Sequence, residues 1–256
     1  MKYQGKTIVI VGPTGSGKTG VAVEIAKRVN GEIISADSRA IFRGMDIGTA
    51  KPTMEEREGV PHYGLDLVEP GERFTVADWK KEAEQKICSI RERGKVPIVV
   101  GGTGLYVDAL VFNYSFDENT KFKREGKAQG TGALAKDRAE MSDEYLVVGI
   151  EWPMDKLRER LARRIDLMFD EGLYEETRRL AERFGWETQA MKSDVYRYVW
   201  GYLQGEYNFD EAKRLATTCD YHLAKRQMTW FKRNNKIIWL PLEQIFDFVL
   251  KCIQDE

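Results

Sequence analysis

The chain has little cysteine, no excess of charge of either sign and no long apolar run. Its three cysteines, Cys88, Cys219 and Cys252, lie far apart and form no C-x-x-C pair. This pattern is typical of a reduced, cytoplasmic protein and argues against a disulfide framework or a cysteine metal site. The apolar run near the N-terminus, residues 7–11, is too short for a signal-peptide core or a membrane span. We therefore expect a cytoplasmic protein that does not enter a membrane.

Charge balance limits the partners of the protein. Forty Lys and Arg stand against 41 Asp and Glu, which gives a formal net charge of −1. No overall field draws such a chain onto nucleic acid, so any RNA binding must come from a local patch. A chain of 256 residues with 42% hydrophobic content can bury a full core. It is long enough for one large domain, or for one domain with a small appendage.

A phosphate-binding loop follows the first apolar run. The motif G-x-x-x-x-G-K-T is formed by Gly12, Pro13, Thr14, Gly15, Ser16, Gly17, Lys18 and Thr19. It stands between a strand and an amphipathic helix, which is the context that this motif requires. Its glycines let backbone N–H groups turn toward an anion, Lys18 supplies a positive charge, and Thr19 supplies a hydroxyl for Mg²⁺. The sequence therefore predicts a diphosphate or polyphosphate ligand, and the loop alone does not say which.

Strands and helices alternate along most of the chain. Apolar runs predict strands at 7–11, 32–37, 96–100, 145–151 and 237–240, and helical periodicity predicts helices near 19–29, 53–57, 75–93, 105–110, 157–168 and 210–231. This order indicates an α/β fold, a P-loop NTPase-like parallel sheet flanked by helices, with its site at the carboxyl ends of the strands. We expect a core of residues 1–112 and 144–256 with C-terminal helices, joined by a shortened polar insertion at 113–143.

Two basic stretches lie outside the phosphate loop. Lys121 to Lys127 falls within the polar insertion. The helix near 157–168 carries Arg158, Arg160, Arg163 and Arg164. Acidic residues interleave these arginines, so we expect them to form a solvated face rather than a binding surface.

Asp37 is the candidate acid of the site. Kinases and NTPases place a magnesium-organising Asp after an apolar strand, whereas the strand 96–100 is followed by Gly101-Gly102-Thr103. Asp37 follows the strand after the phosphate-loop helix, where strand ends meet in such folds. Its carboxylate is placed to accept a proton from a nucleophile, or else to form an Asx turn or a helix cap. Both interpretations stay open on Asp37 alone.

Several ordered motifs resemble the tRNA dimethylallyltransferase (tRNA isopentenyltransferase) family. They are the phosphate loop 12–19, the segments 35–38, 44–52, 61–62 and 101–106, and the block Ala224-Lys225-Arg226-Gln227-Met228-Thr229-Trp230. The resemblance implies that the loop holds the pyrophosphate of dimethylallyl diphosphate, with Mg²⁺ helped by Thr19. It also implies a tRNA acceptor, the N6 amine of the adenosine 3′ of the anticodon, flipped out of its stack.

The resemblance also assigns roles to individual residues. It implies that Asp37 is the catalytic base and that Thr103 hydrogen-bonds near the reacting centre. It implies tRNA contacts by Asp37, Ser38, Arg39, Ala40, Thr103, Lys225, Arg226 and Gln227. Taken alone, a threonine such as Thr103 in a glycine-rich turn more often caps the backbone. We expect a monomer whose partners are tRNA and dimethylallyl diphosphate.

The sequence departs from the family pattern in several places. The large insertion that grips the anticodon arm is reduced to residues 113–143, and no match to the family's Arg-rich segment near its end is found. Val195 precedes Tyr196 where the family has a Gly-Tyr turn, and Tyr221 stands where it has an arginine. Two alternatives therefore remain beside a minimal tRNA prenyltransferase. One is a small-substrate enzyme, either an adenine-nucleotide isopentenyltransferase or a P-loop phosphotransferase, and the other is a non-catalytic RNA-binding relative.

Overall fold

A parallel sheet forms the centre of the protein. The computed structural model of the chain describes residues 5–116, 140–192 and 194–254. Within these ranges the strands are β1 (Thr7–Val11), β2 (Gly31–Ser35), β3 (His62–Tyr63), β4 (Val96–Gly101), β5 (Tyr145–Glu151) and β6 (Ile238–Pro241). They pair in the order β3-β2-β4-β1-β5-β6, and every pair is parallel. The predicted parallel α/β sheet is confirmed.

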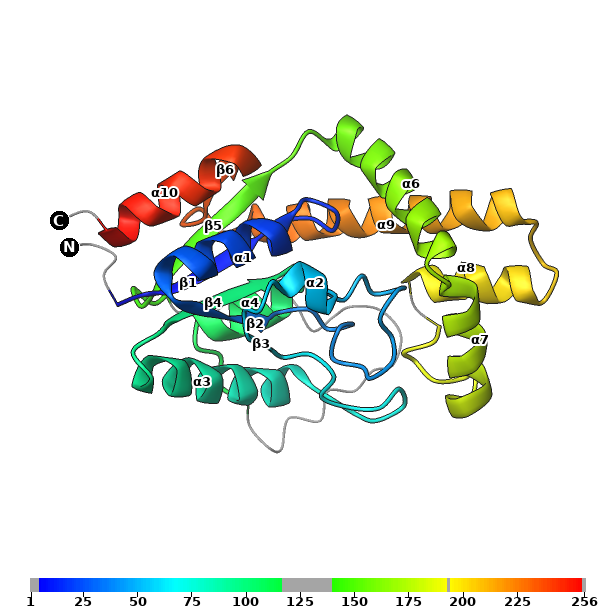
Figure 1. The fold of residues 1–256 in the computed structure, drawn as a ribbon, viewed down its shortest axis with the longest axis horizontal. Helices are drawn as coiled ribbons and strands as arrows, with labels where there is room; N and C mark the ends of the chain where they lie inside the picture. The colour runs from blue at the N-terminus through cyan, green and yellow to red at the C-terminus, as the bar shows by residue number, and fades with distance from the viewer. Residues whose placement is uncertain (1–4, 117–139, 193, 255–256) are drawn as a thin grey trace.

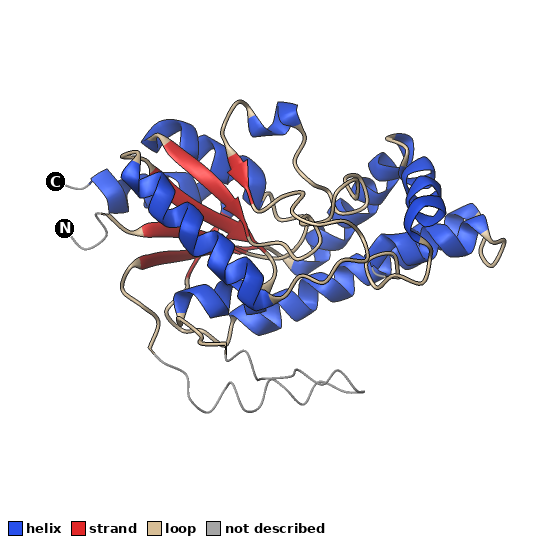
Figure 2. Cartoon of the chain, turned by 90° about the horizontal axis from the view of Figure 1, so that it is seen from below, coloured by secondary structure: helices blue, strands red, loops and turns tan. Residues whose placement is uncertain are grey.

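Helices cover both faces of this sheet. The described helices are α1 (Lys18–Val29), α2 (Met54–Arg57), α3 (Val76–Glu92), α4 (Gly104–Val111), α6 (Met154–Asp170), α7 (Leu173–Phe184), α8 (Asp194–Leu203), α9 (Phe209–Phe231) and α10 (Leu242–Gln254). Helices α1 and α10 lie on one face, and α3 and α4 on the other (Figure 1). Figure 2 shows the sheet between these two layers. No described helix is both long and apolar enough to cross a bilayer.

Alternation along the strands explains the two layers. In β1, Ile8 and Ile10 pack toward α1 and α10, whereas Val9 and Val11 pack toward α3 and α4. Successive side chains of a strand point to opposite faces, so a continuous apolar run fits a strand that is covered on both sides. On the α3 face Trp79 is fully buried. The strand is therefore the rigid base from which the phosphate loop leaves the sheet.

A helical extension projects beyond the carboxyl ends of the strands (Figure 1). It consists of α6 to α8 and the first turns of α9, packed around a separate apolar cluster that includes Met45, Ile165, Met191 and Val199. Helix α9 runs from this extension back to the sheet, where Phe231 joins the sheet core. One long helix thus ties the extension to the strand ends.

Sequence patterns located some boundaries and missed others. The capping box at Thr53 and Glu56 is confirmed, since both reciprocal hydrogen bonds are present. The helix expected near 210–231 is confirmed as α9, which begins one residue earlier because the Asn208 side chain accepts the Glu211 N–H at 2.9 Å and caps the helix. The strand expected at 32–37 ends at Ser35. Helices α7, α8 and α10 were not foreseen. Most of the expected insertion 113–143, including the basic run 121–127, lies outside the described residues.

Candidate active site

The carboxyl ends of three neighbouring strands meet at one edge of the sheet. Val11 of β1 pairs with Gly101 of β4, and Ser35 of β2 pairs with Val100 of β4. The chain therefore leaves β1, β2 and β4 at the same level. A cavity of about 1350 Å³ lies at this edge, and its lining includes the segments 14–20, 37–40 and 100–105. The phosphate loop, Asp37 and Thr103 thus share one cavity.

The phosphate loop turns around this cavity. Residues 14–19 line it, whereas Gly12 and Pro13 are buried behind it and do not contribute to its lining. Gly15 and Gly17 have φ of 75° and 87°, a left-handed conformation that other residues rarely adopt. The loop ends at Gly17, which precedes α1, so the positive end of the helix dipole faces the cavity.

Lys18 is the basic group at the bottom of the loop. Its Nζ donates a hydrogen bond to the Pro13 carbonyl oxygen at 2.6 Å. Burial lowers the pKa of Lys18 to about 8; the nearby Asp37 carboxylate opposes this shift and the Arg164 guanidinium adds to it. A buried ammonium whose pKa is lowered in this way gains a strong charged partner when an anion enters the loop.

Asp37 forms the Asx turn that was one of its two interpretations. Its Oδ1 accepts the Arg39 N–H at 2.8 Å and the Ala40 N–H at 3.4 Å. Its Oδ2 makes no hydrogen bond within the described part of the chain. One oxygen therefore fixes the carboxylate beside Lys18, and the other remains available to a substrate proton. The turn and the base are compatible roles.

Thr103 joins the turn after β4 to the turn after β2. Its Oγ1 accepts the Ser38 N–H at 2.9 Å and lies 3.2 Å from the Ser38 Oγ, to which it donates. Its own N–H donates to the Ala36 carbonyl oxygen at 3.1 Å. The hydroxyl thus caps the backbone, as such a threonine commonly does, and it does so at the wall of the cavity.

The block 224–230 of α9 packs against the phosphate loop and the glycine-rich turn. Gln227 Oε1 accepts the Thr14 N–H at 2.7 Å. A Cβ at Gly102 would overlap the Gln227 side chain, and a Cβ at Gly104 would overlap the Trp230 ring. These two glycines are required because α9 approaches the backbone closely. Gln227 therefore holds the loop in place, in addition to the tRNA contact that the resemblance implied.

The two basic residues of this block, Lys225 and Arg226, differ in position. Arg226 lines the cavity, whereas Lys225 does not. The Lys225 Nζ lies 4.6 Å from the centre of the Tyr221 ring, and the Arg158 guanidinium lies 5.6 Å from it. Tyr221, at the position of the family's arginine, thus attracts two cations through its ring face. Neither of these cations lines the cavity.

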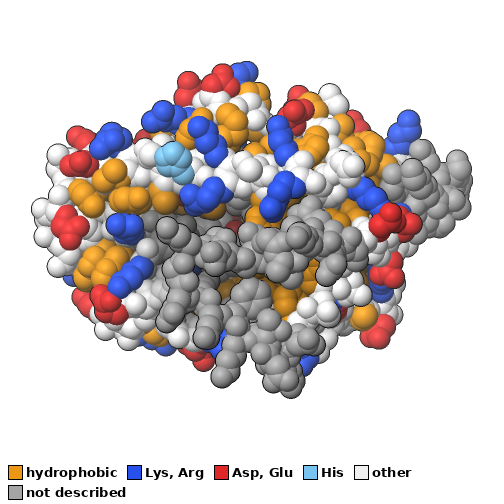
Figure 3. Space-filling view, turned by 180° about the vertical axis from the view of Figure 1, so that it is seen from behind, with side chains coloured by type: hydrophobic (Ala, Val, Ile, Leu, Met, Phe, Trp, Pro, Cys, Tyr) orange, Lys and Arg blue, Asp and Glu red, His pale blue; other side chains and the backbone are white. Residues whose placement is uncertain are grey.

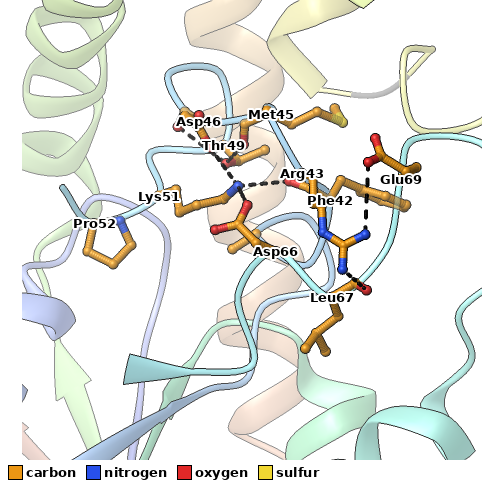
Figure 4. A network of polar contacts seen from close by, with 12 residues as sticks. Phe42, Arg43, Met45, Asp46, Thr49, Lys51, Pro52, Asp66, Leu67 and Glu69 are labelled. Carbon is orange, nitrogen blue, oxygen red and sulfur yellow. Dashed lines mark hydrogen bonds and ion pairs between the residues drawn. The ribbon is translucent and has the colours of Figure 1, made fainter. Parts of the chain in front are cut away.

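The loop 44–52 forms another wall of the cavity. The Lys51 ammonium is buried and donates to the Phe42 carbonyl oxygen at 2.8 Å and to Asp46 and Asp66 carboxylates at 2.6 Å each (Figure 4). Buried charges require such partners. The next residue, Pro52, lines the cavity. The long motif in this segment therefore encodes a rigid wall.

Glu176 of α7 fixes the same loop from the helical extension. Its carboxylate accepts the backbone N–H groups of Asp46, Ile47 and Gly48 at 2.9–3.0 Å, and the Tyr196 hydroxyl at 2.6 Å. Burial, followed by the charge of Glu176, raises the pKa of Tyr196 well above its usual value. The sequence patterns did not predict that Glu176 fixes this loop. An acidic residue is favoured at its position, in the first turn of a helix, because it faces the positive end of the helix dipole.

The residue before Tyr196 needs no special backbone conformation here. Val195 lies within α8, is almost fully buried, and is not among the described residues with positive φ. At the position of the glycine in the family's Gly-Tyr turn, this chain therefore has a helical valine that packs into the apolar cluster of the helical extension. The Tyr196 ring still reaches the loop, because a Cβ at Gly48 would overlap it.

The arginines of α6 correct an expectation. Arg158 is exposed and outside the cavity, but Arg160, Arg163 and Arg164 line it. Arg164 NH1 donates to Thr14 Oγ1 at 2.7 Å. Arg160 and Arg163 are exposed, as expected for a solvated face, although they border the cavity. The expectation is wrong for the half-buried Arg164, because α6 packs on the phosphate loop, a tertiary contact that the alternation of acidic and basic residues does not reveal. On the face seen in Figure 3, Lys and Arg side chains lie among acidic and apolar ones.

Comparisons with known proteins agree with this geometry. A sequence model of IPP transferases matches residues 40–143 and 122–234, and one of isopentenyl transferases matches residues 5–66. The tRNA dimethylallyltransferase of Acetivibrio thermocellus is 37% identical over 97% of this chain and 95% of its own length. The tRNA dimethylallyltransferase of Geobacter metallireducens is 36% identical over 99% of this chain and 98% of its own length. The first alignment spans 298 positions, more than the 256 residues of this chain, so the relative carries segments that this chain lacks.

Solved structures of similar proteins share the fold. The tRNA isopentenylpyrophosphate transferases of Staphylococcus epidermidis and Bacillus halodurans each superpose with a TM-score of 0.82 at 32% identity. They cover 97% and 98% of this chain, and the match spans 98% of each of them. A eukaryotic dimethylallyltransferase acting on tRNA has the same fold, with a TM-score of 0.80 at 22% identity. The chain therefore belongs to the tRNA dimethylallyltransferase family of prenyltransferases.

Proposed function

We propose that the protein transfers a dimethylallyl group from dimethylallyl diphosphate to N6 of the adenosine 3′ of the anticodon in tRNA. One observation carries this proposal: a phosphate loop and a carboxylate with one uncommitted oxygen, Asp37, line the same cavity. At the strand end where a kinase has its acid, this chain has Gly101. The absence of a Cβ there lets the Ala36 carbonyl approach closely. This arrangement favours a prenyl diphosphate over a nucleoside triphosphate.

The acceptor amine needs help because its lone pair is delocalised into the adenine ring. Orientation and proton removal are the contributions that a protein can make to such a nucleophile. N6 attacks the allylic carbon that bears the diphosphate, the carbon–oxygen bond to the diphosphate breaks, and the N6 proton passes to Asp37 Oδ2. The Asx turn keeps Oδ1 occupied, so the carboxylate presents one defined oxygen to the amine.

The leaving pyrophosphate gains charge as its bond to the prenyl group breaks. Lys18 and the amides of the loop lie where they can stabilise that charge, and positioned donors of this kind act most strongly in a partly buried site. In this structure the Lys18 ammonium donates a hydrogen bond to the Pro13 carbonyl oxygen. We infer that it exchanges this neutral acceptor for a phosphate oxygen when the donor binds.

The residues present fit a magnesium ion held mainly by substrate. Thr19 and Asp37 line the cavity with oxygen donors, and no group of three or more His, Cys, Asp or Glu with metal-binding geometry occurs among the described residues. Mg²⁺ commonly binds through one or two protein oxygens plus phosphate oxygens and water. Thr19 would hold the ion, which would neutralise diphosphate charge.

The tRNA should enter over the turn that follows Asp37. Ser38, Arg39 and Ala40 line the cavity beside Thr103, and Arg226 lines it from α9. A stacked adenine cannot present its amine to a carbon inside a cavity, so the base must be flipped out of the anticodon loop. We further propose that the protein works as a monomer in the cytoplasm.

A donor and acceptor matrix tests this proposal. The protein is incubated with Mg²⁺ and either dimethylallyl diphosphate or ATP, together with either bulk tRNA or AMP, and the nucleosides are analysed by mass spectrometry. We expect N6-dimethylallyladenosine only from the tRNA and dimethylallyl diphosphate arm. Prenylated AMP would indicate a small-substrate enzyme, phosphorylation from ATP a phosphotransferase, and no product in any arm a non-catalytic relative.

A further inference from the structure

The wall of the cavity carries two leucines that belong to no apolar core. Leu167 of α6 and Leu223 of α9 both line the cavity. Leu167 is 58% exposed, and Leu223 is half-buried. Within the described part of the chain, neither residue belongs to, or packs against, any of the four apolar core clusters. Both side chains therefore offer apolar surface to whatever enters the cavity.

These leucines lie farther from the sheet than the arginines beside them. Helix α6 runs away from the sheet, and α9 runs back toward it (Figure 1). Arg163 stands one turn before Leu167, and Arg226 stands one turn after Leu223. Both arginines are exposed and line the cavity. On each helix the arginine is thus nearer to the strand ends, and the leucine is nearer to the helical extension.

A nucleobase of an RNA loop fits this combination of side chains. Exposed arginines bind the phosphates of a nucleic-acid backbone. Apolar side chains such as leucine insert between bases or cover their faces where stacking is broken. When one base leaves the stack, its neighbour in the loop loses a stacking partner. An apolar side chain at the mouth of the cavity is placed to cover the face that this neighbour exposes.

We propose that Leu167 and Leu223 bind a base next to the flipped adenosine and so hold the anticodon loop open. The inference rests on the proposed function, in which that adenosine enters the cavity. A single leucine on a protein surface needs no explanation. Here two leucines, each one turn from an exposed arginine, line the same cavity.

The prenyl group of the donor is the other apolar ligand in the proposed reaction. Its reacting carbon must lie between the phosphate loop and Asp37, at the strand ends, where the charges of Lys18 and Asp37 interact. An apolar group gains most from a wall that removes it from water. Leu167 is more exposed than buried, and it lies on the side of Arg163 that is away from the sheet. Its position therefore favours the base over the prenyl group.

The test is a double-mutant cycle between the protein and an anticodon stem-loop. The stem-loop carries 2-aminopurine in place of the target adenosine, and its fluorescence rises when that base leaves the stack. Leu167→Ala should raise the Kd for this RNA about 3- to 30-fold, as expected for the loss of apolar contact area, and should reduce the fluorescence gain. When the neighbouring nucleotide that Leu167 contacts is abasic, the same substitution should have no effect on the Kd.

Three further variants are measured beside Leu167→Ala. Leu223→Ala should raise the Kd in the same direction. Leu167→Met keeps an apolar side chain of similar volume and should stay close to wild type. Met54→Ala removes a side chain that is 70% exposed and does not line the cavity, so it should leave the Kd unchanged. Thermal melting checks that each variant folds, and Leu223→Ala decides the matter if Leu167→Ala does not.

The outcomes separate this inference from the proposed function. An unchanged Kd in both alanine variants overturns the inference, and so does a rise that persists with an abasic nucleotide on either side of the target. If Leu167→Ala weakens binding of dimethylallyl diphosphate but not of pyrophosphate, the leucine contacts the prenyl group, which also overturns it. Wild-type protein that shows the coupling but does not prenylate tRNA contradicts the proposed function alone.

Discussion

The Gln227 side chain accepts a hydrogen bond from the backbone N–H of Thr14, 213 residues earlier in the chain, at 2.7 Å. This bond connects α9 to the phosphate loop. It also takes the Thr14 amide away from the anion, so the loop amides that face the ligand must come from later residues. Together with the Arg164 bond to the Thr14 hydroxyl, it clamps the first turn of the loop from two helices.

Gln227→Leu should destabilise the protein by about 1–3 kcal/mol, because it leaves the partly buried Thr14 N–H without its acceptor. Urea denaturation measures the loss. Thr229→Ala changes an exposed residue two positions along the same helix and should have little effect. Equal stability of the two variants would show that water replaces the Gln227 acceptor.

Donor binding should weaken above about pH 8. Lys18 has a pKa of about 8 in the free protein because burial disfavours its charge. The donor binds the protonated form, so above that pH a proton must be taken up on binding, and the Kd for pyrophosphate should rise about tenfold per pH unit. Below pH 8 the charge is already present and this dependence disappears. Titrations from pH 7 to pH 9.5 check this, with Lys18→Met as the variant in which the bend at pH 8 is lost. A wild-type Kd that stays constant across the range would contradict the role of Lys18.

Gly101→Ala should destabilise the sheet edge by about 1–3 kcal/mol or more, because the new Cβ overlaps the Ala36 carbonyl group and backbone cannot easily move aside. Gly20→Ala is the matched control. Gly20 lies in α1 with open space around its Cβ position, so alanine should stabilise that helix by about 0.5–1 kcal/mol. Thermal melting of both variants gives the comparison, and a shift of the same sign in both would refute the packing argument.

Glu176→Ala should cost about 2–5 kcal/mol, since three backbone N–H groups of the loop 46–48 lose their acceptor. Glu175→Ala, next to it on the exposed side of α7, should change stability little. Tyr196→Phe removes one of the four hydrogen bonds and should fall between the two. Chemical denaturation ranks them. If Glu175→Ala proved as costly as Glu176→Ala, the effect would belong to helix propensity rather than to the loop.

Much of the fold was predictable because local patterns agree with it. The strand and loop around Lys18 form a motif whose function depends on local geometry, and the capping boxes at Thr53 and Thr75 depend only on residues three positions apart. Helix α7 was not predicted, although Leu173, Leu180 and Ala181 follow helical spacing. The burial of Glu176 on the same face is explained only once its partner loop is known.

The site was predictable to the extent that strand topology brings motifs together. Placing Asp37 beside the loop followed from its position at the end of a parallel strand. The place of Thr103 at the site came from the resemblance to the family. The roles of Glu176 and Arg164 did not follow, because both depend on how the helical extension packs on the strand ends. An arginine on a charged helix has the same sequence pattern whether it faces solvent or a phosphate loop.

The measurement that tests the account most directly is single-turnover prenylation of tRNA by Asp37→Asn. Asparagine keeps an oxygen for the Arg39 N–H, so the turn should survive while the base is lost. We predict a rate about 10²–10⁴-fold below wild type, with the Kd for dimethylallyl diphosphate nearly unchanged. Prenylation at close to the wild-type rate would show that Asp37 serves only the turn, and it would contradict the claim that one cavity joins the phosphate loop to its base.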